Sequence, residues 1–206
     1  MGRASDAREK ILASAQSLIE LRGYSALGVA EICKAAAVPK GSFYYFFESK
    51  EALGLAVIDA QWDAQRRAWA RILRNGAAPL DRLRQLLEET EAHQRARQRS
   101  CGTVSGCLFG NLTLELSNQT ETIRERLQQI FMAQLEMAEA VITEAVERGD
   151  VYVSDTRMAA RSLIAQLEGQ MLFAKLHNNT QRLDTIWADW LLLLGAHRAA
   201  AEAVTS

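Results

Sequence analysis

The sequence predicts an all-α protein, in which three N-terminal helices are joined by a long fourth helix to a helical-bundle C-terminal part, with about nine helices in all. Two observations on composition support this. Proline occurs twice and glycine twelve times in 206 residues, while Ala, Leu, Glu, Gln and Arg, which favour helices, are abundant. A third is that apolar residues recur at intervals of three and four in successive segments, which is the spacing of one helix face.

Two helices are expected at the N-terminus. The first, at residues 6–22, ends at Gly23, since glycine suits the position that follows a helix. The second, at about residues 29–36, places Cys33 on its inner face as a core residue. A short turn at Ala37-Val38 follows, so these helices lead directly into a third.

The third helix is expected within the aromatic stretch 38–47. Pro39 suits its first turn, because proline has no N–H and its φ is fixed near the helical value. Three phenylalanines at roughly helical spacing would anchor it on a core: Phe43, Phe46 and Phe47. The remaining residues supply a cation, close backbone approach and three hydroxyls: Lys40, Gly41, Ser42, Tyr44 and Tyr45.

Six further helices complete the prediction. Ser49 can cap a long helix from Lys50 to about Arg74. The others are expected at about 80–99, 107–117, 120–148, 154–178 and 181–204, separated by Gly-, Pro- and Asn-containing breaks.

Composition and charge limit the possible functions. The net charge is -1, yet residues 1–50 carry +2 and the remainder -3, which indicates a small basic face at one end. The odd number of cysteines, three, argues against a disulfide scaffold and for a reducing cytoplasm. No apolar run is long enough for a membrane span, and we see no secretory signal. No His or Cys pair has zinc-ligand spacing, so we expect no metal and no cofactor.

Residues 8–54 resemble the DNA-binding domain of the tetracycline-repressor (TetR) family of bacterial regulators. The resemblance is carried by matched residues in order: Ile11-Leu12, Arg22-Gly23-Tyr24, Val29-Ala30-Glu31-Ile32, Lys40-Gly41-Ser42-Phe43-Tyr44-Tyr45-Phe46 and Ser49-Lys50-Glu51-Ala52-Leu53. It implies a helix-turn-helix domain at 1–54 and an effector-binding and dimerisation domain at 55–206. It further implies a regulator, expected to be a repressor, that binds a near-palindromic operator as a homodimer.

The resemblance assigns the DNA contacts. It places the third helix in the major groove, with Lys40, Gly41, Ser42, Tyr44, Tyr45 and Lys50 as the residues that contact DNA. Arg3 and Arg8 are weaker candidates, as contacts from the N-terminal arm. Many relatives carry glycine where this chain has Ala37; if that position needs a positive φ, alanine costs about 1 kcal/mol there.

A second resemblance concerns residues 102–115. The resemblance is to the family subgroup of N-ethylmaleimide-responsive and acrylate-responsive repressors, and it is carried by Gly102-Thr103-Val104-Ser105-Gly106-Cys107-Leu108, then Gly110-Asn111-Leu112 and Glu115, together with Ala174-Lys175-Leu176. This implies that Cys107 senses electrophiles or oxidants. A helix start would stabilise its thiolate, and Lys175 would do so if it packs there. Alternatively Cys107 is a small buried hydrophobe, and Lys175 is a surface residue or the counter-ion of a carboxylate ligand.

Other residues of the C-terminal part have two possible roles. Trp62 and Phe109 could line an effector pocket, although aromatic residues at helical spacing more often belong to a core. The last two helices are apolar enough to form a two-fold dimer interface through seven residues: Leu163, Leu167, Met171, Trp187, Trp190, Leu191 and Leu194. An effector near Cys107 would then displace the fourth helix and change the separation of the two DNA-binding domains.

Three other functions remain open from sequence. The fold could bind a small carboxylic acid reversibly, without cysteine chemistry. It could be a thiol peroxidase or transferase that uses Cys107, but no histidine lies near it as a general base and the match at 8–54 would be unexplained. It could also be a helical adaptor that has lost DNA binding. We therefore expect a regulator rather than an enzyme.

Overall fold

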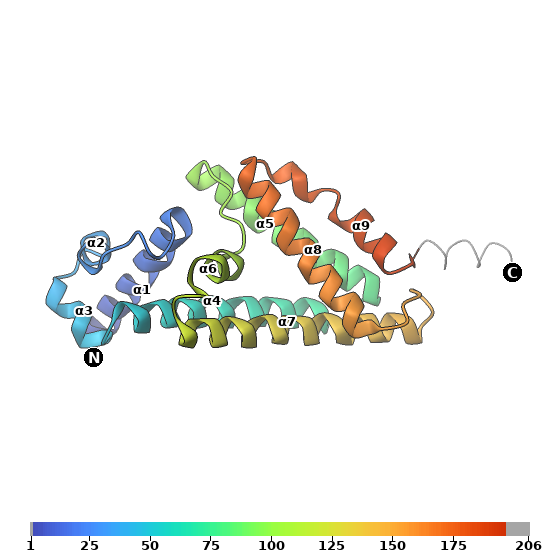
Figure 1. Ribbon diagram of the computed structural model, residues 1–206, viewed down its shortest axis with the longest axis horizontal. Coiled ribbons are helices and arrows are strands. Elements are labelled where there is room, and N and C mark those ends of the chain that lie inside the picture. The colour runs from blue at the N-terminus through green and yellow to red at the C-terminus, as the bar shows by residue number, and fades with distance from the viewer. Residues whose placement is uncertain (1, 197–206) are drawn as a thin grey trace, which may run out of the picture. The chain divides into compact units, whose positions relative to one another are not determined.

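The computed structural model describes residues 2–196, with side chains from residue 6, and these residues are helical without strands (Figure 1). The helices are α1 (Gly2–Arg22), α2 (Val29–Ala35), α3 (Lys40–Phe46), α4 (Lys50–Leu73), α5 (Pro79–Cys101), α6 (Leu108–Leu116), α7 (Glu121–Glu147), α8 (Thr156–Leu176), the 3-10 helix η1 (Thr180–Leu183) and α9 (Ile186–Leu193). The all-α prediction is confirmed. No helix in this part of the chain is long and apolar enough to cross a membrane.

The last helix differs from its expected extent. In place of one helix from Gln181, the chain forms η1, whose first turn is capped by the Asn179 side chain, and then the short helix α9. Gly195, with φ of 65°, follows α9, and a Cβ there would lie 2.9 Å from the carbonyl oxygen of Tyr152. Local capping therefore overrides the apolar periodicity on which the longer helix was predicted. The rest of that predicted helix, 197–204, lies outside the described residues.

The chain divides into two compact units. The first unit contains the residues up to Gln65 together with Leu108–Gln129, and the second contains Arg66–Cys107 and everything from Ile130. The whole helix-turn-helix region therefore lies in the first unit, which also holds much of α4, all of α6 and the start of α7. The expected domains, 1–54 and 55–206, were drawn along the sequence, so their boundaries differ from those of these two compact units.

The core of the first unit holds α1, α2 and α3 together. Ile11 and Phe43 have no exposed surface, and Ile32 is 1% exposed. Polar contacts add to this packing: the Gln16 side chain donates to Gln61 at 2.8 Å, which ties α1 to α4. A helix of seven residues such as α3 is stable here because its aromatic face is buried against its neighbours.

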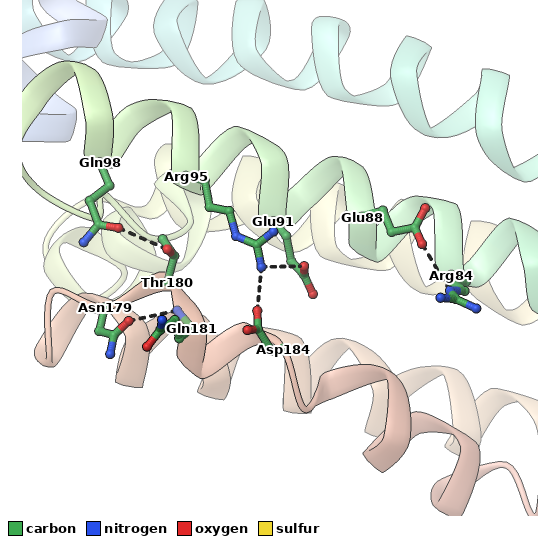
Figure 2. A network of polar contacts seen from close by, with 9 residues as sticks. All are labelled: Arg84, Glu88, Glu91, Arg95, Gln98, Asn179, Thr180, Gln181 and Asp184. Atoms are coloured by element: carbon green, nitrogen blue, oxygen red, sulfur yellow. Dashed lines mark hydrogen bonds and ion pairs between the residues drawn. The ribbon is translucent and has the colours of Figure 1, made fainter.

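The second unit is built around α5, α8 and α9, with the adjoining parts of α4 and α7. Figure 2 shows the contacts between η1 and α5. The Arg95 guanidinium of α5 binds Asp184 at 2.5 Å and Glu91 of its own helix at 3.2 Å, and Thr180 donates a hydrogen bond to Gln98 at 3.0 Å. Burial raises the pKa of Glu91, and the Arg95 charge opposes that shift. These contacts fix the segment between α8 and α9.

Candidate DNA-reading helix and cysteine-bearing loop

The two faces of α3 have opposite character. Phe43 is completely buried and Phe47, directly after the helix, is 4% exposed, with ring centroids 5.8 Å apart. Tyr44 and Tyr45 are 57% and 78% exposed. Phe43 and Phe47 thus anchor the helix and both tyrosines face solvent, whereas Phe46, the third expected anchor, is only half-buried.

The start of α3 presents its backbone as well as its side chains. Lys40 and Gly41 are exposed at its first two positions, and Ser42 is half-buried. A Cβ placed on Gly41 would meet no atom within 4 Å, so the fold itself does not require glycine there.

The turn between α2 and α3 requires an unusual backbone conformation at Ala37. Its φ is 53°, in the left-handed region, so this position does need the positive φ at which alanine is disfavoured relative to glycine. The Val38 N–H donates to the Cys33 carbonyl at 3.0 Å and the Ala37 N–H to the Lys34 carbonyl at 3.2 Å. This is the hydrogen-bond pattern of a Schellman turn, in which glycine is the usual residue.

Lys50, the sixth residue expected at DNA, is half-buried. Its ammonium nitrogen lies 4.3 Å from the centroid of the Tyr24 ring, a cation–π contact. Burial lowers the pKa of Lys50, and the nearby Glu115 carboxylate opposes that shift. In this conformation the Lys50 charge is directed at Tyr24, whereas Lys40 is directed at solvent.

The loop before Cys107 is held by two side-chain amides. Gln94, 4% exposed, donates to the Gly106 carbonyl at 3.0 Å and accepts from the Gly106 N–H at 3.1 Å. Asn178 accepts from the Val104 N–H at 2.8 Å and donates to the Gly102 carbonyl at 3.0 Å. Sequence reasoning missed both amides, because neither Gln94 within α5 nor Asn178 just after α8 belongs to a periodic pattern.

Cys107 is half-buried, directly precedes α6 and packs against the core of the second unit. Its thiol forms a hydrogen bond with Glu168 of α8, a residue that the sequence did not single out. Burial raises the pKa of Glu168, and this hydrogen bond lowers it in part. The hydrogen-bond partner of the Cys107 thiol is therefore a carboxyl group, which the sequence did not predict.

Of the other expected sensor residues, one is exposed and two are buried in the first unit. Lys175 is exposed in the last turn of α8. Trp62 and Phe109, 5% and 1% exposed, belong to the first unit, where their rings meet edge-on at a centroid distance of 6.3 Å. These two aromatic side chains fill the core of that unit.

Most residues expected at the dimer interface are internal. Five of the seven are no more than 5% exposed within the second unit: Leu163, Leu167, Met171, Trp190 and Leu194. A side chain already covered by its own chain has no surface left for a partner, so these five belong to the core of the protomer. Trp187 and Leu191 are half-buried. The exposed apolar side chains of the same two helices are others: Met158, Leu172, Phe173, Leu176, Leu192 and Leu193.

Comparison with known proteins agrees with this organisation. Residues 11–57 match the family described as "Bacterial regulatory proteins, tetR family", and residues 79–190 match "Tetracyclin repressor-like, C-terminal domain". The chain is 30% identical to the HTH-type transcriptional repressor NemR of Escherichia coli over 89% of this chain and 91% of NemR. It is 33% identical to the transcriptional regulator AcuR of Cereibacter sphaeroides over 84% of this chain and 78% of that protein.

Solved structures give the same result. The crystal structure of a regulatory protein TetR from Rhodobacter sphaeroides matches with a TM-score of 0.82 at 30% identity, over 89% of this chain and 96% of that one. The reduced form of Escherichia coli NemR matches with a TM-score of 0.75 at 28% identity, over 90% and 95%. The chain therefore belongs to the tetracycline-repressor family of transcriptional regulators, and within it resembles the subgroup that contains NemR.

Proposed function

We propose that this protein is a transcriptional repressor that reads operator DNA with the exposed face of α3. Regulators of this family bind operator DNA as dimers and respond to small-molecule effectors. The observation that carries the proposal is the division of α3 into a buried phenylalanine face and an exposed face with Lys40, Gly41, Tyr44 and Tyr45.

The chemistry of that face suits a major groove. Lys40 can bind a phosphate or the acceptor edge of a guanine, and Gly41 lets the backbone come close to the sugar-phosphate chain. Tyr44 and Tyr45 can donate their hydroxyl groups to bases or phosphates, and Ser42 can do so if its side chain turns outward. Two copies related by a two-fold axis would read a near-palindrome, with half-sites about one helical turn apart or more.

For dimerisation we propose the exposed apolar face of α8 and α9, in particular Leu172, Phe173, Leu176, Leu192 and Leu193. These side chains are between 47% and 71% exposed in the protomer, on the two helices for which an interface was expected. Burying them against the same residues of a second copy would give a self-complementary contact. Trp187 and Leu191 would lie at its margin.

For the effector we propose an electrophile that alkylates Cys107. In an addition to an activated double bond, the sulfur–carbon bond forms as the thiol proton passes to Glu168 and then to the carbon next to the carbonyl group. Two facts support this: the backbone before the thiol is held by Gln94, and the thiol has a carboxylate partner that can take its proton. Reversible binding of a small carboxylic acid, with Lys175 as its counter-ion, is the alternative.

The test is a mobility-shift assay with duplex DNA from the region directly upstream of the gene. Lys40→Ala and Tyr45→Ala are expected to weaken binding by about tenfold or more, and Lys40→Ala to reduce the salt dependence by about one ion. Arg84→Ala, an exposed arginine of the second unit that pairs with Glu88, is the matched control for loss of one cation. Equal binding by the control and both variants would contradict the proposed reading face.

The effector is tested with N-ethylmaleimide and, separately, with acrylate. N-Ethylmaleimide should release DNA from the wild-type protein but not from Cys107→Ser, whose DNA affinity without reagent should be unchanged. Release of the serine variant by N-ethylmaleimide would remove Cys107 from the sensing role. If acrylate releases DNA from Cys107→Ser but not from Lys175→Ala, the result would favour reversible binding of a carboxylic acid.

A further inference from the structure

Glu115, in the last turn of α6, holds the turn that follows α1. Its Oε2 accepts a hydrogen bond from the Tyr24 N–H at 3.0 Å, and its Oε1 accepts one from the Ser25 N–H at 2.6 Å. Both oxygens of one carboxylate thus bind successive backbone N–H groups about 90 positions away in sequence. Hydrogen bonds from N–H groups to an ionised carboxylate are stronger than those between neutral groups.

The backbone of this turn is shaped to admit the carboxylate. Gly23 has a φ of 82°, and a Cβ there would lie 3.2 Å from Glu115 Oε2. Its N–H still donates to the Ile19 carbonyl at 2.8 Å, so α1 ends normally. Glycine therefore serves two needs at this position: a left-handed conformation and space for the oxygen of Glu115.

Tyr24 connects the same turn to the start of α4. Its ring lies under the Lys50 ammonium group, and a Cβ on Gly54 would be only 2.8 Å from its Cε2 atom. Burial and the charges of Glu51 and Glu115 raise the pKa of Tyr24 to about 12. Glu115, the Gly23–Ser25 turn, Tyr24 and Lys50 thus form one connected polar cluster inside the first unit, which we call the Glu115 latch.

We propose that the Glu115 latch is the connection through which α6 directly holds the DNA-reading helices α1–α3, in parallel with the contact that α1 makes with α4. That second contact is the hydrogen bond from Gln16 to Gln61. The position of α6 matters because the helix begins at the residue after Cys107. The regulatory meaning of the latch rests on the function proposed above, whereas its mechanical role does not.

The geometry sets how sensitive the latch is. The two hydrogen bonds are 3.0 and 2.6 Å long, and an N–H···O contact is lost once donor and acceptor separate beyond about 3.5 Å. A shift of α6 by about 1 Å would therefore break both contacts or carry the turn along with it. A turn carried along would tilt α1 and, through their shared core, α2 and α3. A small displacement of α6 would then move the exposed face of α3 without bending α4.

The mechanical role is tested with Glu115→Ala, Glu115→Gln and a matched control, Glu121→Gln. Glu121 is an exposed glutamate of the first unit that pairs only locally, with Arg124 at 2.6 Å. Hydrogen exchange of the amides in residues 22–29 is measured by mass spectrometry on the full chain. The alanine variant should exchange Tyr24 and Ser25 about tenfold faster or more, the glutamine variant less so, and the control like wild type. Unchanged exchange in both Glu115 variants would refute the latch.

The regulatory role is tested by DNA affinity before and after N-ethylmaleimide treatment. If α6 acts through Glu115, Glu115→Gln should bind the upstream duplex severalfold more weakly than Glu121→Gln, and the reagent should change its affinity severalfold less than that of wild type. If Glu115→Gln and Glu121→Gln bind DNA equally well, and Glu115→Gln responds to the reagent as wild type does, transmission through the Glu115 latch is refuted. Cysteine sensing would not be affected by this result. A wild-type protein that does not respond would refute the sensing proposal, and hydrogen exchange would still decide the latch.

Discussion

Replacing Ala37 by glycine should stabilise the protein. Ala37 has a φ of 53°, and an L-residue with a Cβ pays about 1–2 kcal/mol in that region, where glycine pays almost nothing. Glycine also has more freedom in the unfolded chain, which costs about 0.4–1 kcal/mol on folding. The difference leaves a gain of about 0.5–1 kcal/mol. Because Ala37 is exposed, no packing is lost that could cancel this gain.

The measurement is urea denaturation followed by circular dichroism, with Ala64→Gly as the matched control. Ala64 is exposed in the middle of α4 within the first unit, where the backbone is helical and glycine costs about 1 kcal/mol relative to alanine. The same chemical change should therefore raise the midpoint at position 37 and lower it at position 64. A decrease at both positions would refute the assignment of left-handed strain to Ala37.

Three further predictions follow from individual residues. Gly41→Ala should leave stability unchanged or slightly higher in thermal denaturation, since a Cβ there meets no atom within 4 Å, but should weaken DNA binding roughly tenfold in a mobility shift. Glu168→Gln should raise stability near neutral pH, because burial raises the pKa of Glu168 above its value in the unfolded chain. The resulting loss of stability in wild type sets in as the pH rises above the unfolded value of about 4.3 and is complete above the raised pKa; below about pH 4 the difference between the two proteins should vanish. The Glu115 carboxylate should instead stabilise the fold at neutral pH. Burial would raise the pKa of Glu115, but hydrogen bonds from Ser25 and Tyr24 and the Lys50 charge hold that pKa below its usual value. The stabilisation is therefore complete above about pH 5 and is lost as the pH falls through the lowered pKa.

Each of these three has an outcome that contradicts it. DNA binding by Gly41→Ala at wild-type affinity would mean that the backbone does not approach DNA at this position. A wild-type advantage over Glu168→Gln at neutral pH would mean that the carboxylate is better accommodated than its burial indicates. For Glu115, the difference in stability between wild type and Glu115→Gln should shrink on acidification; a constant difference from pH 7 to pH 3 would exclude a contribution from its charge.

The helices and the anchoring of α3 could be predicted from the sequence because they depend on local rules. Apolar spacing located eight helices to within a few residues, and the distinction between Phe43 and its tyrosine neighbours followed from the need to support a seven-residue helix. The left-handed turn at Ala37 could be anticipated from the resemblance, because many relatives carry glycine at this position.

The remaining features depend on contacts between distant parts of the chain. An apolar face such as that of α8 must be covered, but its periodicity does not say whether the cover is its own chain or a second copy; for Leu163 and Leu167 it is the chain itself. The Glu168 partner of Cys107 lies on α8, and the Asn178 amide binds Val104 from 74 positions away in sequence. Nothing in the local pattern distinguishes them from other polar residues.

The two amides that hold the loop before Cys107 have a consequence for how this loop can vary. Gln94 and Asn178 bind main-chain groups of Gly102, Val104 and Gly106, so the path of the loop does not depend on the side chain at the exposed position 103. Thr103 can therefore be exchanged while the backbone of the loop keeps its path. The side chain at position 103 and the position of Cys107 can thus be altered independently of each other.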